Sequence, residues 1–161
     1  MPHKKFIISL LVENKVGVLQ RITGVFSKRK FNLLTITVGE TETPEVSRMT
    51  ITTEGDEDIK EQIVKQLNKM VEVLKVSEIL EGEAVIREIA LIKITAKDFM
   101  MRSEIINYAE IFRGRIVDVG KSSVTVEITG TPEKTDAFLK LVKSFGIKEM
   151  VRTGVTAIAR G

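Results

Sequence analysis

The stretch from residue 6 to residue 19 reads FIISLLVENKVGVL and sets the pattern for the whole chain. Residues 6–12 are apolar at nearly every position, which predicts a central strand buried on both faces. A short loop follows and ends at Gly17. Beyond this glycine the apolar side chains recur at the spacing of a helix with one buried face: Val18, Leu19, Ile22, Val25 and Phe26.

Four further elements complete the first half of the chain. Residues 34–38 and 46–53 alternate apolar with polar side chains, which predicts two half-buried strands. Gly55 followed by the acidic run at 56–58 indicates a helix start, and a buried stripe at helical spacing follows between residues 59 and 70. Residues 71–76 predict a fourth strand, so the expected order is β-α-β-β-α-β.

The same order recurs in the second half. Its expected elements are a strand at 89–95, a helix around 105–112, a hairpin of 115–119 with 123–129, a helix opened by Thr131-Pro132-Glu133, and a last strand region at 147–159 bent at Gly154. A hydroxyl cap followed by proline is a strong helix start. Gly114 is expected to cap the C-terminus of the first of these two helices.

The repeated order predicts an α+β fold of two tandem ferredoxin-like βαββαβ domains, each an antiparallel sheet with helices on one face. We expect the domains at 1–77 and 87–161, joined by a linker at 78–86. The uncovered face of the first sheet would carry small polar side chains and one arginine: Thr35, Thr37, Arg48, Thr50 and Thr52. Such a face suits a partner or water equally well.

Composition excludes several classes of function. The chain of 161 residues has no cysteine and one histidine, His3, which leaves almost nothing for a metal centre or a catalytic triad. The 25 basic and 22 acidic residues give a net charge of +3, without the dense basic face of a nucleic-acid binder. No apolar run is long enough to span a membrane, and no signal peptide is recognisable. We therefore expect a cytoplasmic protein with no catalytic and no metal-binding residues.

The loop after the first strand is the most informative place for a ligand. Free N–H groups at a helix start favour a carboxylate or phosphate, and Gly17 lets the backbone approach it closely. The Asn14 amide oxygen offers an acceptor for an ammonium group, and Asn32 is expected to reach the same region. The alternative is purely structural: Asn14 caps a turn, Gly17 relieves strain and Asn32 is a loop residue.

Two other functions of this fold lack their residues here. RNA recognition needs exposed aromatic side chains on the middle strands, and residues 34–38 and 46–53 carry none. An acylphosphatase needs an arginine in the loop after the first strand, and residues 13–18 contain none. Fold alone therefore does not assign the function.

The segment VENKVGVLQR at 12–21 resembles the start of an ACT domain, the amino-acid-sensing module. Four further stretches resemble the small, regulatory subunit of acetolactate synthase, also called acetohydroxyacid synthase: SRMTI at 47–51, QLNKMVEV at 66–73, EIFRGRIVDV at 110–119 and RTGV at 152–155. Because these stretches are spread over both halves, the resemblance covers nearly the whole chain.

This resemblance implies a non-catalytic role. In the family the large subunit carries thiamine diphosphate, a divalent metal (Mg²⁺) and usually FAD, and it joins pyruvate to a second 2-keto acid in branched-chain amino-acid biosynthesis. The small subunit carries no cofactor. It raises the activity of the large subunit and confers feedback inhibition, usually by valine. The effector binds between two ACT domains of a homodimer.

The resemblance also suggests which residues bind the effector. Asn14, Gly17 and Asn32 match family positions tied to effector binding. The backbone of Lys15, Val16, Gly17, Val18 and Leu19 would hold the effector carboxylate, and the two asparagines would orient its polar groups, partly across the dimer. Val12, Leu19 and Leu33 would enclose its side chain. Lys15-Val16 stands where many relatives have small residues or proline, which leaves the identity of the effector open.

Arg48 and Thr50, on the uncovered sheet face, are the expected docking residues for the catalytic subunit. Two other functions stay open at this stage. One is an ACT-type amino-acid sensor that regulates a different enzyme. The other is an enzyme on this fold, such as a phosphatase, for which the needed His, Cys and loop arginine are missing.

Overall fold

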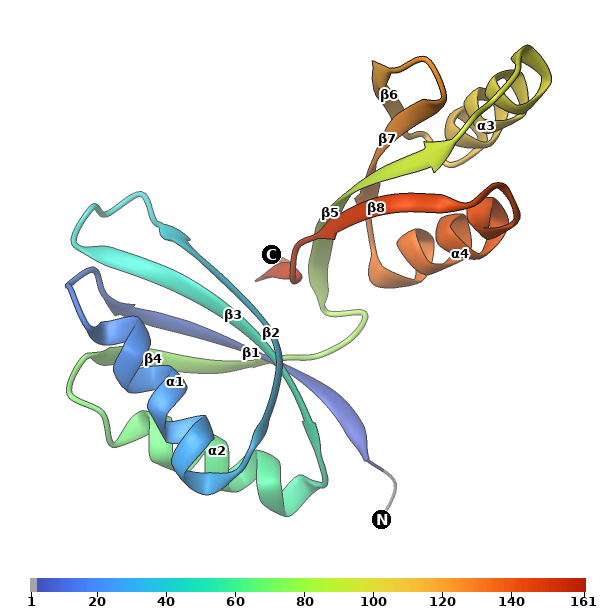
Figure 1. The fold of residues 1–161 in the computed structure, drawn as a ribbon. Helices are drawn as coiled ribbons and strands as arrows, with labels where there is room; N and C mark the ends of the chain where they lie inside the picture. Colours follow the sequence, from blue (N-terminus) through green and yellow to red (C-terminus); the bar gives the residue numbers. More distant parts are fainter. Residues whose placement is uncertain (1–2) are drawn as a thin grey trace. The chain divides into compact units, whose positions relative to one another are not determined.

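The computed structural model describes residues 3–161. The chain forms two compact units, drawn in Figure 1. The first contains the chain up to Val85 together with Gly154–Gly161, and the second contains Ile86–Thr153. None of the helices within residues 3–161 is long and apolar enough to cross a membrane.

The first unit has the expected β-α-β-β-α-β order. Its elements are β1 (Lys4–Glu13), α1 (Val18–Arg29), β2 (Asn32–Glu40), β3 (Val46–Gly55), α2 (Glu57–Asn68) and β4 (Val73–Ile79). The sheet order is β2-β3-β1-β4, and every neighbouring pair is antiparallel. Both helices lie on one face of this sheet (Figure 1).

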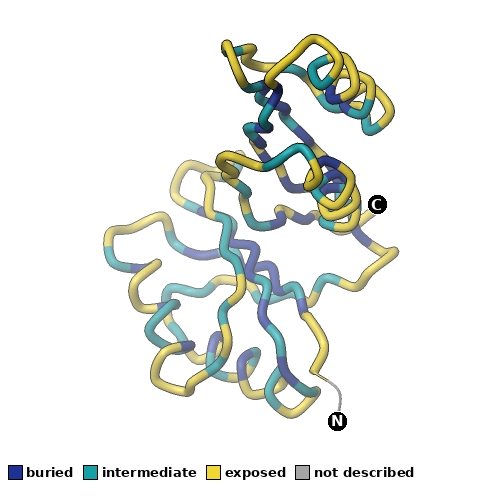
Figure 2. Tube along the Cα trace, turned by 45° about the vertical axis from the view of Figure 1, so that its right-hand side comes forward, coloured by how far each residue is buried: buried dark blue, intermediate teal, exposed yellow. Residues whose placement is uncertain are grey.

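The core of the first unit lies between the sheet and its helices. Alternate residues of β1 point into it, so Ile8, Leu10 and Val12 are fully buried. The apolar stripe of α1 meets them through Val18, Ile22 and Phe26. In Figure 2 the buried residues follow the strands and the inner sides of the helices. The apolar side chains that recur every 3.6 residues in the helices and every 2 residues in the strands therefore pack into one core.

The second unit repeats this arrangement. Its elements are β5 (Ala84–Thr95), α3 (Phe99–Ile111), β6 (Arg115–Val119), β7 (Ser123–Gly130), α4 (Pro132–Val142), a short 3₁₀ turn η1 (Lys143–Phe145) and β8 (Ile147–Arg152). The sheet order is β6-β7-β5-β8. Thr131 caps α4 by accepting a hydrogen bond from the N–H of Lys134, as its sequence predicts. The predicted pair of ferredoxin-like folds is confirmed.

The end of the chain departs from the expectation of one strand region at 147–159 within the second domain. After β8 the chain turns and forms β9 (Thr156–Ala159), which pairs with β5, and Gly154–Gly161 belong to the first unit. Val155 and Ala157 are buried there, and Thr37 Oγ1 donates a hydrogen bond of 3.0 Å to the Val155 carbonyl. Two alternating apolar side chains and a polar anchor therefore hold this segment on the first unit.

Two other details differ from the sequence reading. The residues between the sheets are largely strand, because β4 continues to Ile79 and β5 begins at Ala84. Helix α3 ends through Arg113, which has a left-handed φ of 55°, and not through Gly114. Gly114 serves close packing instead, because a Cβ there would lie 2.5 Å from Ile128 Cδ1 on β7.

Candidate functional site

The turn from β1 into α1 leaves backbone donors without partners. Gly17 precedes the helix with φ 86° and ψ −9°, and no side chain caps the helix. The Val18 N–H donates to the Lys15 carbonyl at 3.4 Å. The N–H groups of Leu19 and Gln20 come before the first backbone hydrogen bond of the helix, so they have no partner within it. The exposed N-terminus of α1 therefore presents N–H groups and the positive end of the helix dipole to an anion.

Asn14 is held in one orientation by both hydrogens of its amide. Asn14 Nδ2 donates to the Pro44 carbonyl at 2.9 Å and to Glu40 Oε1 at 3.3 Å. The Asn14 backbone N–H also donates to the Glu45 carbonyl at 2.8 Å. Because the nitrogen is occupied, the free group of this side chain is its oxygen, which is an acceptor for an ammonium group.

The surroundings of the loop combine ion pairs with exposed apolar side chains. Lys15 pairs with Glu13 at 3.2 Å, and Arg21 Nε pairs with Glu72 Oε1 at 2.6 Å. Val16 is fully exposed and Leu19 is about half exposed. The loop therefore offers an apolar surface next to the polar groups that an amino-acid backbone needs.

Asn32 lies far from this loop within one chain, contrary to expectation. It is opposite Glu54 on β3, whereas the end of β1 at Glu13 is opposite Val46. Eight positions of extended chain separate these two points of β3, about 26 Å. Asn32 Nδ2 donates to Glu54 Oε1 at 2.5 Å, and Leu33 packs partly against the core.

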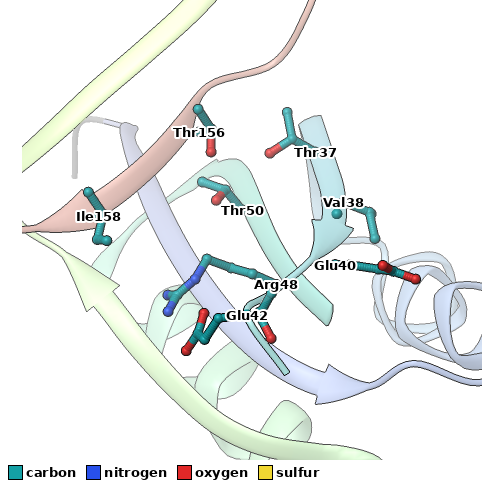
Figure 3. Close-up of a pocket in the computed structure, with 10 residues that line it drawn as sticks. Thr37, Val38, Glu40, Glu42, Arg48, Thr50, Thr156 and Ile158 are labelled. Atoms are coloured by element: carbon teal, nitrogen blue, oxygen red, sulfur yellow. The ribbon is translucent and has the colours of Figure 1, made fainter. Parts of the chain in front are cut away.

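The expected docking face is less open than the sequence suggests. Thr50 is only 1 % exposed, and Arg48 is half-buried, with Nη1 donating to Ser9 Oγ at 2.8 Å. Both line a pocket whose wall includes residues of β9 (Figure 3). The returning C-terminal segment covers another part of this face, because Val155 accepts a hydrogen bond from Thr37 and Gly154 lies against Thr35. Docking of a catalytic subunit at these two residues stays a prediction.

Sequence reasoning missed Glu40 and Pro44, the residues that orient Asn14. Glu40 is 26 positions and Pro44 is 30 positions away along the chain, so no local pattern connects them to Asn14. Within residues 3–161 no cluster of three His, Asp or Glu side chains could hold a metal ion.

Known proteins resemble both units. A family model for the small subunit of acetolactate synthase matches residues 87–161, and one for the AHAS small subunit-like ACT domain matches residues 8–75. A probable acetolactate synthase small subunit of Methanothermobacter thermautotrophicus is 56 % identical over 155 residues, covering 96 % of this chain and 92 % of the relative. The acetolactate synthase small subunit of Bacillus subtilis is 50 % identical over 159 residues, covering 98 % and 91 %.

The chain belongs to the acetolactate synthase small-subunit family. A crystal structure of the Thermotoga maritima small subunit agrees, with a TM-score of 0.89, 42 % identity and 98 % coverage of both chains. Membership of this family implies a large catalytic subunit as partner. It also supports the resemblance that the motifs at 12–21 and 110–119 indicate.

Proposed function

We propose that this chain is the regulatory subunit of an acetolactate synthase. It activates the thiamine-diphosphate-dependent catalytic subunit and confers feedback inhibition by a branched-chain amino acid, valine in the first instance. It performs no chemistry itself. The observation that carries this proposal is the uncapped N-terminus of α1 beside the oriented amide oxygen of Asn14.

The chemistry of the loop fits an amino-acid zwitterion. Its carboxylate would accept hydrogen bonds from the N–H groups of Leu19 and Gln20 in the first turn of α1, where the helix dipole favours negative charge. Its ammonium group would donate to the Asn14 oxygen. The exposed side chains of Val16 and Leu19 would contact an apolar side chain, and one methylene is worth only about 1–3 kcal/mol of selectivity.

The effector would bind between two copies of the chain. β2 is an edge strand of its sheet, so its outer side is open to pairing. Symmetric antiparallel pairing of two β2 strands about Ile36 would set Asn32 of one copy opposite Glu40 of the other. Glu40 is bonded to Asn14, so the two asparagines, about 26 Å apart along one sheet, would meet across the dimer.

Feedback inhibition then follows from differential binding. An effector that bridges two first units favours the arrangement of the complex in which its contacts are complete. A coupling free energy of about 1–3 kcal/mol would shift the equilibrium between active and inhibited complexes by about 5–150-fold.

The test is calorimetric titration of the full chain with L-valine, alone and in complex with the catalytic subunit of the same organism. We expect binding by the native chain and a loss of at least tenfold in affinity for Asn14→Ala, Asn32→Ala and Gly17→Asp. Asn107→Ala, an exposed asparagine on α3, is the matched control and should bind normally.

Acetolactate formation by the complex completes the test. Activation by this chain and its reversal by valine are the expected results. Absence of binding both alone and in the complex would overturn the proposed site. Valine binding without any effect on acetolactate formation would instead favour the second reading, an ACT-type sensor that regulates a different enzyme.

A further inference from the structure

A pocket of about 400 Å³ lies in the first unit, at the polar face of its sheet. The β2–β3 hairpin forms its base and one side, and β9 forms the opposite wall (Figure 3). Its lining includes Thr37 and Glu42 from the hairpin, Arg48 and Thr50 from β3, and Thr156 and Ile158 from β9. Glu40, which accepts a hydrogen bond from Asn14, also lines the pocket, whereas the six residues above make no hydrogen bond to Asn14.

The Arg48 guanidinium in this pocket has unused hydrogen-bonding capacity. One guanidinium nitrogen of Arg48 donates to Ser9, and Arg48 forms no ion pair within 4.0 Å in the described part of the chain. Its other N–H groups are therefore free to bind a carboxylate. Thr50 also lines the pocket and is 1 % exposed.

The charged side chains of the pocket favour a ligand that carries both a negative and a positive charge. The Glu42 carboxylate lies beside the Arg48 guanidinium in Figure 3, yet the two are not paired within 4.0 Å. A dianion such as phosphate would be repelled by Glu42. A carboxylate directed at Arg48 with an ammonium group directed at Glu42 satisfies both side chains, and α-amino acids carry these two groups on one carbon.

Ile158 supplies an apolar contact on the β9 side of the pocket and is more than half exposed. We propose that this pocket is a second amino-acid site, which takes a free α-amino acid with a small apolar side chain. Because Thr156 and Ile158 come from β9, an occupied pocket also holds the C-terminal segment on the first unit.

The pocket shares Glu40 with the surroundings of the Asn14 loop, but Arg48 and Thr50 line the pocket alone, so variants at these two residues and at Asn14 test the two sites separately. The experiment is equilibrium dialysis of the full chain with radiolabelled L-valine, L-leucine and L-alanine. We expect two classes of site in the native chain. Asn14→Ala removes one class, and Arg48→Met weakens the other at least tenfold while leaving the first.

Matched variants separate binding from folding. Lys75→Met makes the same change of charge on β4 of the same sheet, outside the pocket lining, and should leave both classes intact. Thr50→Val keeps the shape of the side chain and removes the hydroxyl. It should weaken the second class while leaving the melting temperature unchanged or higher, whereas a purely structural hydroxyl would lower it.

Two results would overturn this proposal. One is that the Asn14→Ala chain binds none of the three amino acids, alone or with the catalytic subunit present. The other is that Arg48→Met abolishes activation of the catalytic subunit in the absence of any amino acid, because the pocket would then hold a segment of that subunit. If the Asn14 loop alone binds no amino acid, binding to the second class of sites can still be measured.

Discussion

Asn14, the residue after β1, and Glu40, the last residue of β2, are 26 positions apart in sequence and are joined by a side-chain hydrogen bond of 3.3 Å. Glu40 occupies the amide nitrogen of Asn14 and so turns the amide oxygen outward. The carboxylate at the end of β2 is therefore a positioning group for the candidate effector site, although it needs no contact with the effector itself.

Removal of this carboxylate should weaken effector binding. We expect Glu40→Ala to lower the affinity for valine about tenfold, about 1.4 kcal/mol, because the Asn14 amide loses one of its two anchors. Glu40→Gln keeps an acceptor oxygen and should bind nearly as the native chain does. Calorimetric titration measures both, and equal affinities for the two variants would contradict the positioning role.

Gly17 should be intolerant of a side chain for reasons of backbone conformation. Its φ of 86° is unfavourable for other residues, so Gly17→Ala should lower the free energy of unfolding by about 1–2 kcal/mol. Gly24→Ala, within the same helix and with open space around its Cβ position, should raise it by about 0.5–1 kcal/mol. Urea denaturation distinguishes the two, and destabilisation by both variants would argue against the conformational explanation.

Arg152 joins three elements of the second unit. It bonds buried Glu88 at 2.7 Å, Asp136 at 2.7 Å and the Pro132 carbonyl at 3.2 Å. Burial opposes the charge of Arg152, but the hydrogen bonds to Glu88 and Asp136 outweigh it and raise the pKa of the guanidinium above its usual value.

Arg152→Met would leave the Glu88 carboxylate buried without a cation. We expect the free energy of unfolding to fall by about 2–4 kcal/mol, measured by urea denaturation. Lys93→Met breaks the exposed pair with Glu149 and should change stability little, since surface ion pairs contribute weakly. A similar effect of the two variants would show that burial of Glu88 is not the cause.

The Lys93–Glu149 pair predicts a measurable pH dependence. The hydrogen bond from the Lys93 ammonium, reinforced by its charge, holds the pKa of Glu149 below its usual value. A lowered carboxylate pKa contributes stability above the unfolded-state value of about 4.3, and that contribution disappears as the pH falls through the folded-state pKa. NMR titration of the Glu149 carboxyl carbon should show the low pKa, and Lys93→Met should return it to the usual range.

The order of elements could be predicted from the sequence because local pattern decides it. The apolar run at 6–12, the alternation at 46–53 and the cap at Thr131 each indicate their own element, and the structure has all three. The return of residues 154–161 to the first unit could not be predicted in this way. It depends on contacts such as Thr37 to Val155, which join residues 118 positions apart.

The candidate site was predictable only in part. Asn14, Gly17 and the start of α1 are adjacent in sequence, so their loop could be found from spacing. The position of Asn32 follows from topology instead. β1 and β2 both run antiparallel to β3, so the start of β2 lies at the opposite end of the sheet from the end of β1. The pocket that Thr50 shares with Thr156 and Ile158 depends on the C-terminal segment, which no pattern near residue 50 indicates.

The return of β9 has a consequence for synthesis of the protein. Residues 86–153 are inserted, in sequence, into the first unit, so its strand β9 is translated only after the whole second unit. While the ribosome is still adding the second unit, the first already has its six sequential elements but lacks the segment that covers its threonine-rich face. Residues 154–161 finish the unit that was begun first, so a ribosome that stalls before residue 154 would release a chain with this surface bare.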